Sequence, residues 1–199
     1  MRAAAVSALT WTEAALARAG VAPDAHHDVA TWAAVTRARY GIPRDGARWN
    51  LVPDDEAAAT DAVRRAVARV NADDFDAADA AITAAEQRWP ALPGVLTARC
   101  ALDYRRGAIA AARRQCDRAI AEGASSWALT LRAMMELEKS RTVSGRTVAQ
   151  LREAIALDPD LVQAWRALGQ GLARTRATAD LEQVRRDYLA RFHRPLPAP

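Results

Sequence analysis

The stretch LREAIALDPDLVQAWRALG, residues Leu151–Gly169, decides the fold predicted for this chain. Its first half is an amphipathic helical segment that closes at Leu157. Asp158 and Pro159 follow, and they end the helix because proline cannot continue it. A second apolar segment then opens around Trp165. The stretch therefore predicts the end of one helix, a tight turn and the start of the next helix.

The same alternation continues from residue 57 to the C-terminus. Ala-rich segments with high helix propensity are separated by short breakers, of which Pro90, Gly123 and Pro159 lie 33 and 36 residues apart. No alternating run of β-branched and aromatic residues predicts a strand. We expect eight helices, or four helix pairs, at residues 57–71, 75–88, 92–106, 108–122, 125–139, 144–157, 161–174 and 178–192.

The first helices of the four pairs carry apolar residues at matching places, with Glu138 as the one exception. These are Ala66, Val67 and Val70; Cys100, Ala101 and Tyr104; Leu131, Met134, Met135 and Glu138; and Trp165, Leu168, Gly169 and Leu172. With terminators spaced near 34 residues, the pattern resembles the tetratricopeptide repeat (TPR) family over about 140 residues. The third unit departs from the family, which prefers a small residue and then a bulky apolar one where this chain has Met135 and Glu138.

The resemblance implies an all-α fold, a right-handed α-solenoid of about four TPR-like helix pairs over residues 57–196. Residues 1–56 differ from the repeats, with expected helices at 3–19 and 27–40 followed by an irregular connector. This segment is interpreted as a helical cap, because the ends of a solenoid need covering. A separate recognition element that docks a partner is the alternative.

In TPR proteins the first helix of each pair lines a concave ligand groove, so the resemblance implies a non-enzymatic scaffold or adaptor. Projected onto this chain, the groove includes Ala98 and Leu102, and its candidate partner-binding residues are Arg64, Arg105, Arg132, Glu136, Lys139, Arg166, Gln170 and Arg174. Guanidinium groups pair bidentately with carboxylates and phosphates, so we expect an acidic protein or peptide partner. Ordinary solvated arginines are the plainer alternative.

Charge divides unevenly along the chain. Residues 1–93 hold 10 basic and 13 acidic residues, a net charge of −3, whereas residues 94–199 hold 18 basic and 11 acidic residues, a net charge of +7. The basic half favours nucleic-acid binding as an alternative function. An accessory subunit of an enzyme or secretion complex, docked through residues 1–56, is a third possibility.

Signatures of catalysis are missing from the sequence, which shows no Gly-rich phosphate loop, nucleophile elbow or HExxH motif. We therefore expect no catalytic residue and no cofactor. His26-His27-Asp28 is the one cluster with metal-ligand chemistry, but adjacent histidines do not readily point at one ion. We interpret these residues as solvated helix-capping groups and expect no metal.

Cys100 and Cys116 fall on opposite helices of one pair, where they could face each other. They are expected to pack as small hydrophobic thiols rather than to form a disulfide. Two cysteines do not make a disulfide framework, and no stretch approaches the roughly 18 apolar residues that a membrane span needs. The sequence therefore predicts a cytoplasmic protein.

Overall fold

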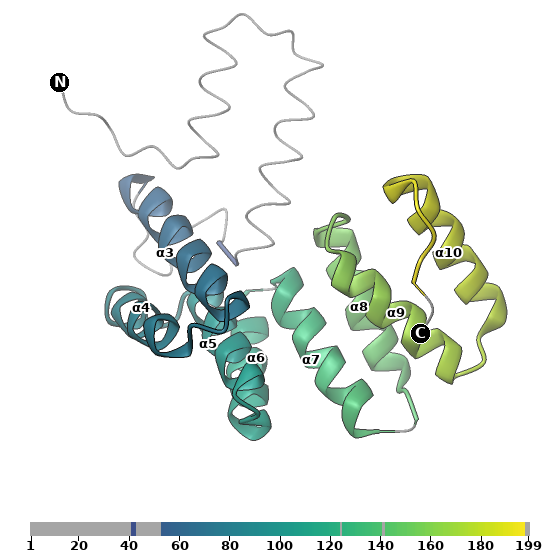
Figure 1. Cartoon of the computed structure of the whole chain (residues 1–199), viewed down its shortest axis with the longest axis horizontal. Helices are drawn as coiled ribbons and strands as arrows, with labels where there is room; N and C mark the ends of the chain where they lie inside the picture. The colour runs from purple at the N-terminus through teal and green to yellow at the C-terminus, as the bar shows by residue number, and fades with distance from the viewer. Residues whose placement is uncertain (1–40, 43–52, 124, 141, 198–199) are drawn as a thin grey trace, which may run out of the picture.

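The structure is a computed structural model that describes residues 41–42, 53–123, 125–140 and 142–197. Every regular element in these ranges is a helix, which confirms the all-α prediction for this part of the chain. The helices are α3 (Pro53–Asn71), α4 (Phe75–Arg88), α5 (Pro93–Arg105), α6 (Ile109–Glu122), α7 (Ser126–Lys139), α8 (Gly145–Leu157), α9 (Val162–Arg174) and α10 (Thr178–Phe192). They follow one another along the long axis of the molecule (Figure 1). The helices expected at 3–19 and 27–40 lie outside the described residues.

Local sequence chemistry places the helix ends close to their predicted positions. The Asp74 carboxylate accepts a hydrogen bond from the backbone N–H of Ala77, and the Ser144 hydroxyl accepts one from Thr147, so both side chains satisfy donors that a helix start leaves unpaired. Ser125 caps α7 in the same way, because its hydroxyl accepts a hydrogen bond from the backbone N–H of Ala128. The largest difference is at α3, which begins at Pro53 instead of residue 57, because proline is favoured in the first turn of a helix.

The helices form two rows. The odd row consists of α3, α5, α7 and α9, and the even row consists of α4, α6, α8 and α10. Each helix packs against its neighbours in the chain, and within the odd row α3 also packs against α5, α5 against α7, and α7 against α9. No even-row helix packs extensively against another even-row helix in the described part of the chain. The odd row is therefore the more closely spaced one.

Buried positions repeat along the odd row at a fixed interval. Val63, Thr97, Leu131 and Trp165 are all buried, and the separation in sequence from each to the next is the same. In the even row, Ala85, Ala119, Ala154 and Tyr188 are buried at that same interval, apart from a single extra position between Ala119 and Ala154. Each pair thus contributes the same positions to the core, with one additional residue inserted within the third pair, between Leu131 on α7 and Ala154 on α8.

The two cysteines form a disulfide. Cys100 on α5 and Cys116 on α6 are bonded, their Cα atoms are 5.4 Å apart, and both residues are fully buried. The prediction that they could face each other is confirmed, but the prediction that they remain thiols is wrong. The spacing of 16 residues carries the chain out along α5 and back along α6, which brings the two Cβ atoms together.

No helix within the described ranges is both long and apolar enough to span a bilayer. The prediction of a cytoplasmic location rested partly on unpaired cysteines, and the disulfide removes that support.

The C-terminal tail folds back onto the last helix pair. Trp165 packs edge-on against Tyr188 and Phe192, with ring centroids 6.1 and 6.4 Å apart. Leu196 joins the same apolar cluster and lies so close to Gly169 that a Cβ atom there would stand 2.7 Å from its Cδ2. The glycine therefore provides the space that the tail fills.

Gly41 fixes the chain against the start of α5. Its carbonyl accepts a hydrogen bond of 2.9 Å from the N–H of Gly94, and its φ of +62° is one that residues with a side chain rarely adopt. A Cβ atom at this position would lie 2.5 Å from the Gly94 nitrogen, which is backbone and cannot move aside.

We expect Gly41→Ala to lower the free energy of unfolding by about 3 kcal/mol, because the left-handed conformation and the backbone overlap both add to the cost. The matched control is Gly107→Ala, where φ is +75° and nothing lies within 4 Å of the added Cβ, so only about 1–2 kcal/mol is expected. Urea denaturation of both variants measures the difference. Equal losses would show that the contact with Gly94 does not constrain the chain.

Candidate functional site

An apolar hollow opens among the first three helices of the odd row. The hollow is small: the space amounts to about 360 Å³ when the open solvent in front of it is counted, but only about 30 Å³ of it admits the centre of a water-sized molecule. Each described residue that lines it comes from the odd row and none from the even row: Val63, Val67 and Asn71 on α3, Gly94, Thr97 and Ala101 on α5, and Trp127 and Leu131 on α7. The hollow therefore lies on the odd-row side of the molecule.

The hollow exists because of the residues at one repeated position. Val63, Thr97 and Leu131 line it, and they occupy the same place in their helices as Trp165 does in α9. Trp165 is buried and packs into the core of the last pair, whereas the three smaller side chains leave space between α3, α5 and α7. Gly94 and Ala101 add little volume, so the space stays open.

The lining is chemically apolar. The hydroxyl of Thr97 donates a hydrogen bond of 2.7 Å to the carbonyl of Pro93, so it is already satisfied within α5. Asn71 is exposed, and its amide makes no hydrogen bond within the described residues. The hollow is therefore complementary to an apolar side chain of a bound peptide. The Asn71 amide is free to hydrogen-bond with the backbone of that peptide.

Next to the hollow, a hydrogen bond joins two helices of the odd row. The Tyr104 hydroxyl on α5 donates to the Glu138 carboxylate on α7. Burial, together with this acceptor, raises the pKa of Tyr104 to about 12, so the hydroxyl keeps its proton at physiological pH. The two residues are 34 positions apart, so the bond links equivalent positions of consecutive pairs.

Two of the predicted partner-binding residues, Arg132 and Glu136, form ion pairs with other side chains of the same chain. Arg132 on α7 pairs with Asp117 on α6 at 2.8 Å and with Glu136 at 2.5 Å, and Arg113 lies 3.5 Å from the same Glu136 carboxylate. The hydrogen bond from Arg132 lowers the pKa of Glu136, with smaller contributions from the neighbouring cations. These side chains stabilise the contact between α6 and α7.

Three more predicted residues also bind within the chain. Arg174 on α9 donates to the backbone carbonyls of Leu137 and Ser140, which places a cation at the negative end of α7. Arg105 pairs with Asp73, and Arg64 pairs with Asp61 on its own helix at 2.6 Å.

The remaining three predicted residues are Lys139, Arg166 and Gln170. Lys139 and Arg166 are exposed and Gln170 is half-buried, and none makes a hydrogen bond or ion pair within the described residues. Ala98 and Leu102, which were expected to face the groove, are buried in the core beneath α3 and α4. The structure therefore divides the predicted set into bonded side chains and three side chains that remain accessible to a partner.

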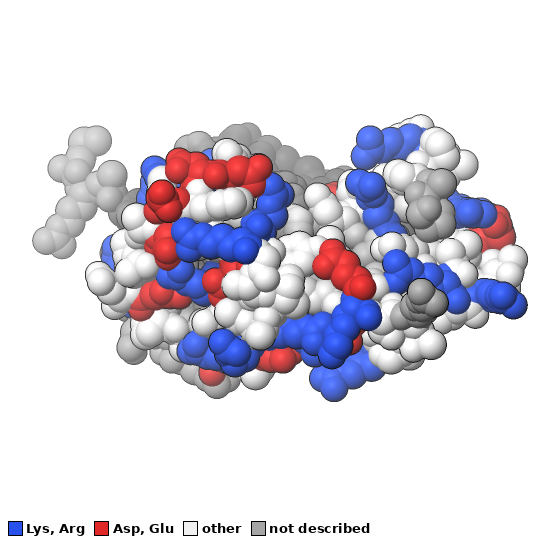
Figure 2. All heavy atoms as spheres, turned by 60° about the horizontal axis from the view of Figure 1, so that its bottom comes forward, with Lys and Arg blue, Asp and Glu red and all other residues white. Residues whose placement is uncertain are grey.

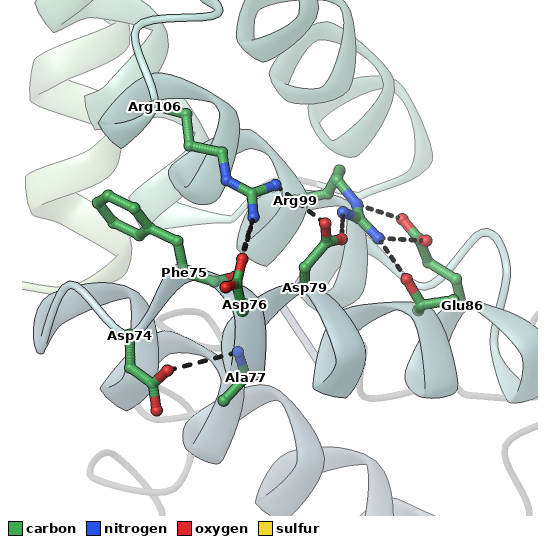
Figure 3. Close-up of polar contacts among 9 residues, drawn as sticks. Asp74, Phe75, Asp76, Ala77, Asp79, Glu86, Arg99 and Arg106 are labelled. Atoms are coloured by element: carbon green, nitrogen blue, oxygen red, sulfur yellow. Dashed lines mark hydrogen bonds and ion pairs between the residues drawn. The ribbon is translucent and has the colours of Figure 1, made fainter.

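The densest polar cluster joins α4 to α5 (Figure 3). Arg99 donates to both oxygens of Glu86, at 3.0 and 2.8 Å, and also pairs with Asp79. Arg106 reaches the same Asp79 at 2.9 Å and donates to the carbonyl of Phe75. The Arg99 side chain is 14% exposed and its charge is matched, so the cluster holds two helices together instead of presenting a free binding group.

Because these hydrogen bonds, from Arg99 first and then Arg106, lower the pKa of Asp79, the cluster stabilises the native state above about pH 4. We expect Arg99→Met to lower the free energy of unfolding at pH 7 by about 2 kcal/mol, less than for a fully buried pair because the carboxylates are partly exposed. The difference from the wild type should shrink as the pH falls through the native pKa of Asp79. Urea denaturation at pH 7 and pH 3 measures both effects.

The control is Arg114→Met on α6, an exposed arginine without a hydrogen bond or ion pair in the described part of the chain. It should change stability by less than about 0.5 kcal/mol at either pH. An Arg99 variant that behaved like this control would show that the cluster does not hold α4 and α5 together.

Basic residues gather toward the C-terminal end of the molecule. Figure 2 shows mixed charges over the first helices, at the left, and mainly Lys and Arg over the last ones, at the right. Several of these arginines are paired, as Arg152 is with Asp180 and Arg191 is with Asp160. Four are exposed with no hydrogen bond or ion pair among the described residues: Arg146, Arg166, Arg176 and Arg194.

Within the described ranges, no group of three or more His, Cys, Asp or Glu residues is arranged to hold a metal ion. His193 is exposed after the end of α10, and His26-His27-Asp28 lie outside those ranges.

No protein-family model, curated protein sequence or solved structure matches this chain.

Proposed function

We propose that this protein is a TPR-like scaffold that binds an extended segment of a partner protein along its odd row. The proposal rests on the buried positions of the odd row, which recur at one constant interval along the sequence. The apolar hollow among the same helices supports it. A period near 34 and helix pairs joined by short turns are typical of the TPR family. No catalytic role is part of this proposal.

The spacing of the two rows supports a curved stack. When helix pairs stack with a small rotation between neighbours, the helices on the inner side come closest together. Here the odd-row helices contact one another and the even-row helices of the described part of the chain do not pack extensively, which favours a curved stack with the odd row on its concave side. The right hand proposed for this stack follows from the resemblance to the TPR family. The hollow then lies on the concave face, where an extended segment makes contact with several pairs at once.

The chemistry of this surface defines the partner. The hollow offers apolar contacts to the tip of a small anchor side chain, and Asn71 offers an amide to the backbone of the bound segment. Toward the C-terminal helices, Lys139 and Arg166 are free to pair with acids. The proposed ligand is therefore a segment with an apolar anchor and acidic residues to one side of it.

We expect Ala101→Met to weaken binding of such a segment at least tenfold, because the longer side chain fills the hollow from the half-buried Ala101 position. Peptides selected from a random displayed library against the wild-type chain provide the ligands, and isothermal titration measures their affinities. Thermal unfolding of the variant verifies that its fold is retained.

Ala110→Met on α6 is the matched control, since Ala110 is exposed on the even row. It should leave peptide affinity unchanged. If selected peptides bound both variants as they bind the wild type, the hollow would have no part in recognition.

Nucleic-acid binding is the second candidate, favoured by the four exposed arginines toward the C-terminal end that make no hydrogen bond or ion pair within the described residues. For this function we expect the affinity for random-sequence single-stranded DNA to fall steeply with salt, because bound arginines release counterions from the phosphates. The double variant Arg166→Glu, Arg176→Glu should bind the DNA more weakly. A plot of the logarithm of its affinity against the logarithm of the salt concentration should also be less steep. Fluorescence anisotropy measures both, and an affinity independent of salt would exclude this candidate.

A further inference from the structure

The Cys100–Cys116 disulfide uses every cysteine in the sequence. It links the two helices of one pair, α5 and α6, across the core of that pair. No thiol is left to exchange with it, so the bond has a single possible pairing within the chain.

Burial protects this bond. Both cysteines are 0% exposed and lie in one apolar cluster with Leu96, Ala112 and Met135, the last of which comes from α7. A thiolate reductant must approach a sulfur atom in order to attack it, and in the folded chain the surrounding helices prevent that approach. Redox-sensing cysteines, by contrast, are accessible and have lowered thiol pKa values. The buried position of the disulfide therefore indicates a structural cross-link and not a redox switch.

The same burial sets the time at which the bond forms. Once α7 has packed over the pair, an oxidant has no more access to the sulfurs than a reductant has. The two cysteines must therefore be oxidised while the chain is still folding. The compartment in which folding takes place must supply the oxidant.

We propose that this protein folds in an oxidising, extracytoplasmic compartment, as a substrate of a disulfide-carrying thiol oxidoreductase. One cysteine thiolate attacks the disulfide of the oxidoreductase and forms a mixed disulfide, and the second thiolate then displaces the oxidoreductase. The chain loses two protons and two electrons in total, and the oxidoreductase is released as a dithiol. Disulfides persist in such compartments and are rare where glutathione and thioredoxin keep thiols reduced.

This proposal does not depend on the proposed partner-binding function. Its first test follows the redox state in the native host. Intact cells are quenched with acid, the protein is denatured, and free thiols are labelled with a maleimide polymer. We expect no adduct without reductant, two adducts after reduction, and the protein in an extracytoplasmic fraction. Two adducts without reductant, or disulfide-bonded protein in the cytosolic fraction, would overturn the proposal.

The second test measures what the bond does for the full-length chain. Reduction under denaturing conditions and refolding with reductant should lower the melting temperature of the wild type by roughly 5–10 °C. The double variant Cys100→Ala, Cys116→Ala keeps small apolar side chains at both positions, and reductant should not affect it. A wild type whose melting temperature is the same with the bond and without it would show that the fold does not require oxidation.

Discussion

The packing of the odd row is the constraint on which the rest of the structure depends. Helices α3, α5, α7 and α9 pack against one another in sequence, and each also packs against the even-row helix that follows it. Because the same helical positions are buried at each step, the register of one pair fixes that of the next. The polar contacts reinforce this register: Tyr104 bonds Glu138 one period away, and Arg174 reaches back to the C-terminal end of α7. The cluster around Arg99 fixes the neighbouring contact between α4 and α5.

Most of the fold in the described ranges could be predicted from the sequence, because its signals are local. Breakers such as Pro90 and Pro159 end helices wherever they occur, and Ser125 caps a helix through a bond to a residue three positions away. The matching positions of the four first helices also proved to share one constant interval. The disulfide was harder to predict, since the sequence brings Cys100 and Cys116 near each other without specifying whether their sulfurs are oxidised.

The candidate site was predicted less well. Helix position indicates which side chains lie on the odd row, but it does not show whether a charged group is already paired with another element. Arg132 was expected in the groove, and its partner Asp117 is on the preceding even-row helix. The sequence analysis did not predict the hollow, because a hollow forms where side chains are too small to fill the space between helices, and no single residue marks such a place. Aligning Val63, Thr97 and Leu131 with Trp165 provides the signal, because these three side chains are smaller than the tryptophan that packs into the core at the equivalent position of α9.

The contact between Leu196 and Gly169 makes Leu196, which follows α10, part of the apolar core of the final helix pair. Proteolytic trimming at that end would leave a vacancy above the glycine and wet the ring cluster of Trp165, Tyr188 and Phe192. Loss of Leu196 would therefore destabilise the last helix pair without touching the apolar hollow among α3, α5 and α7.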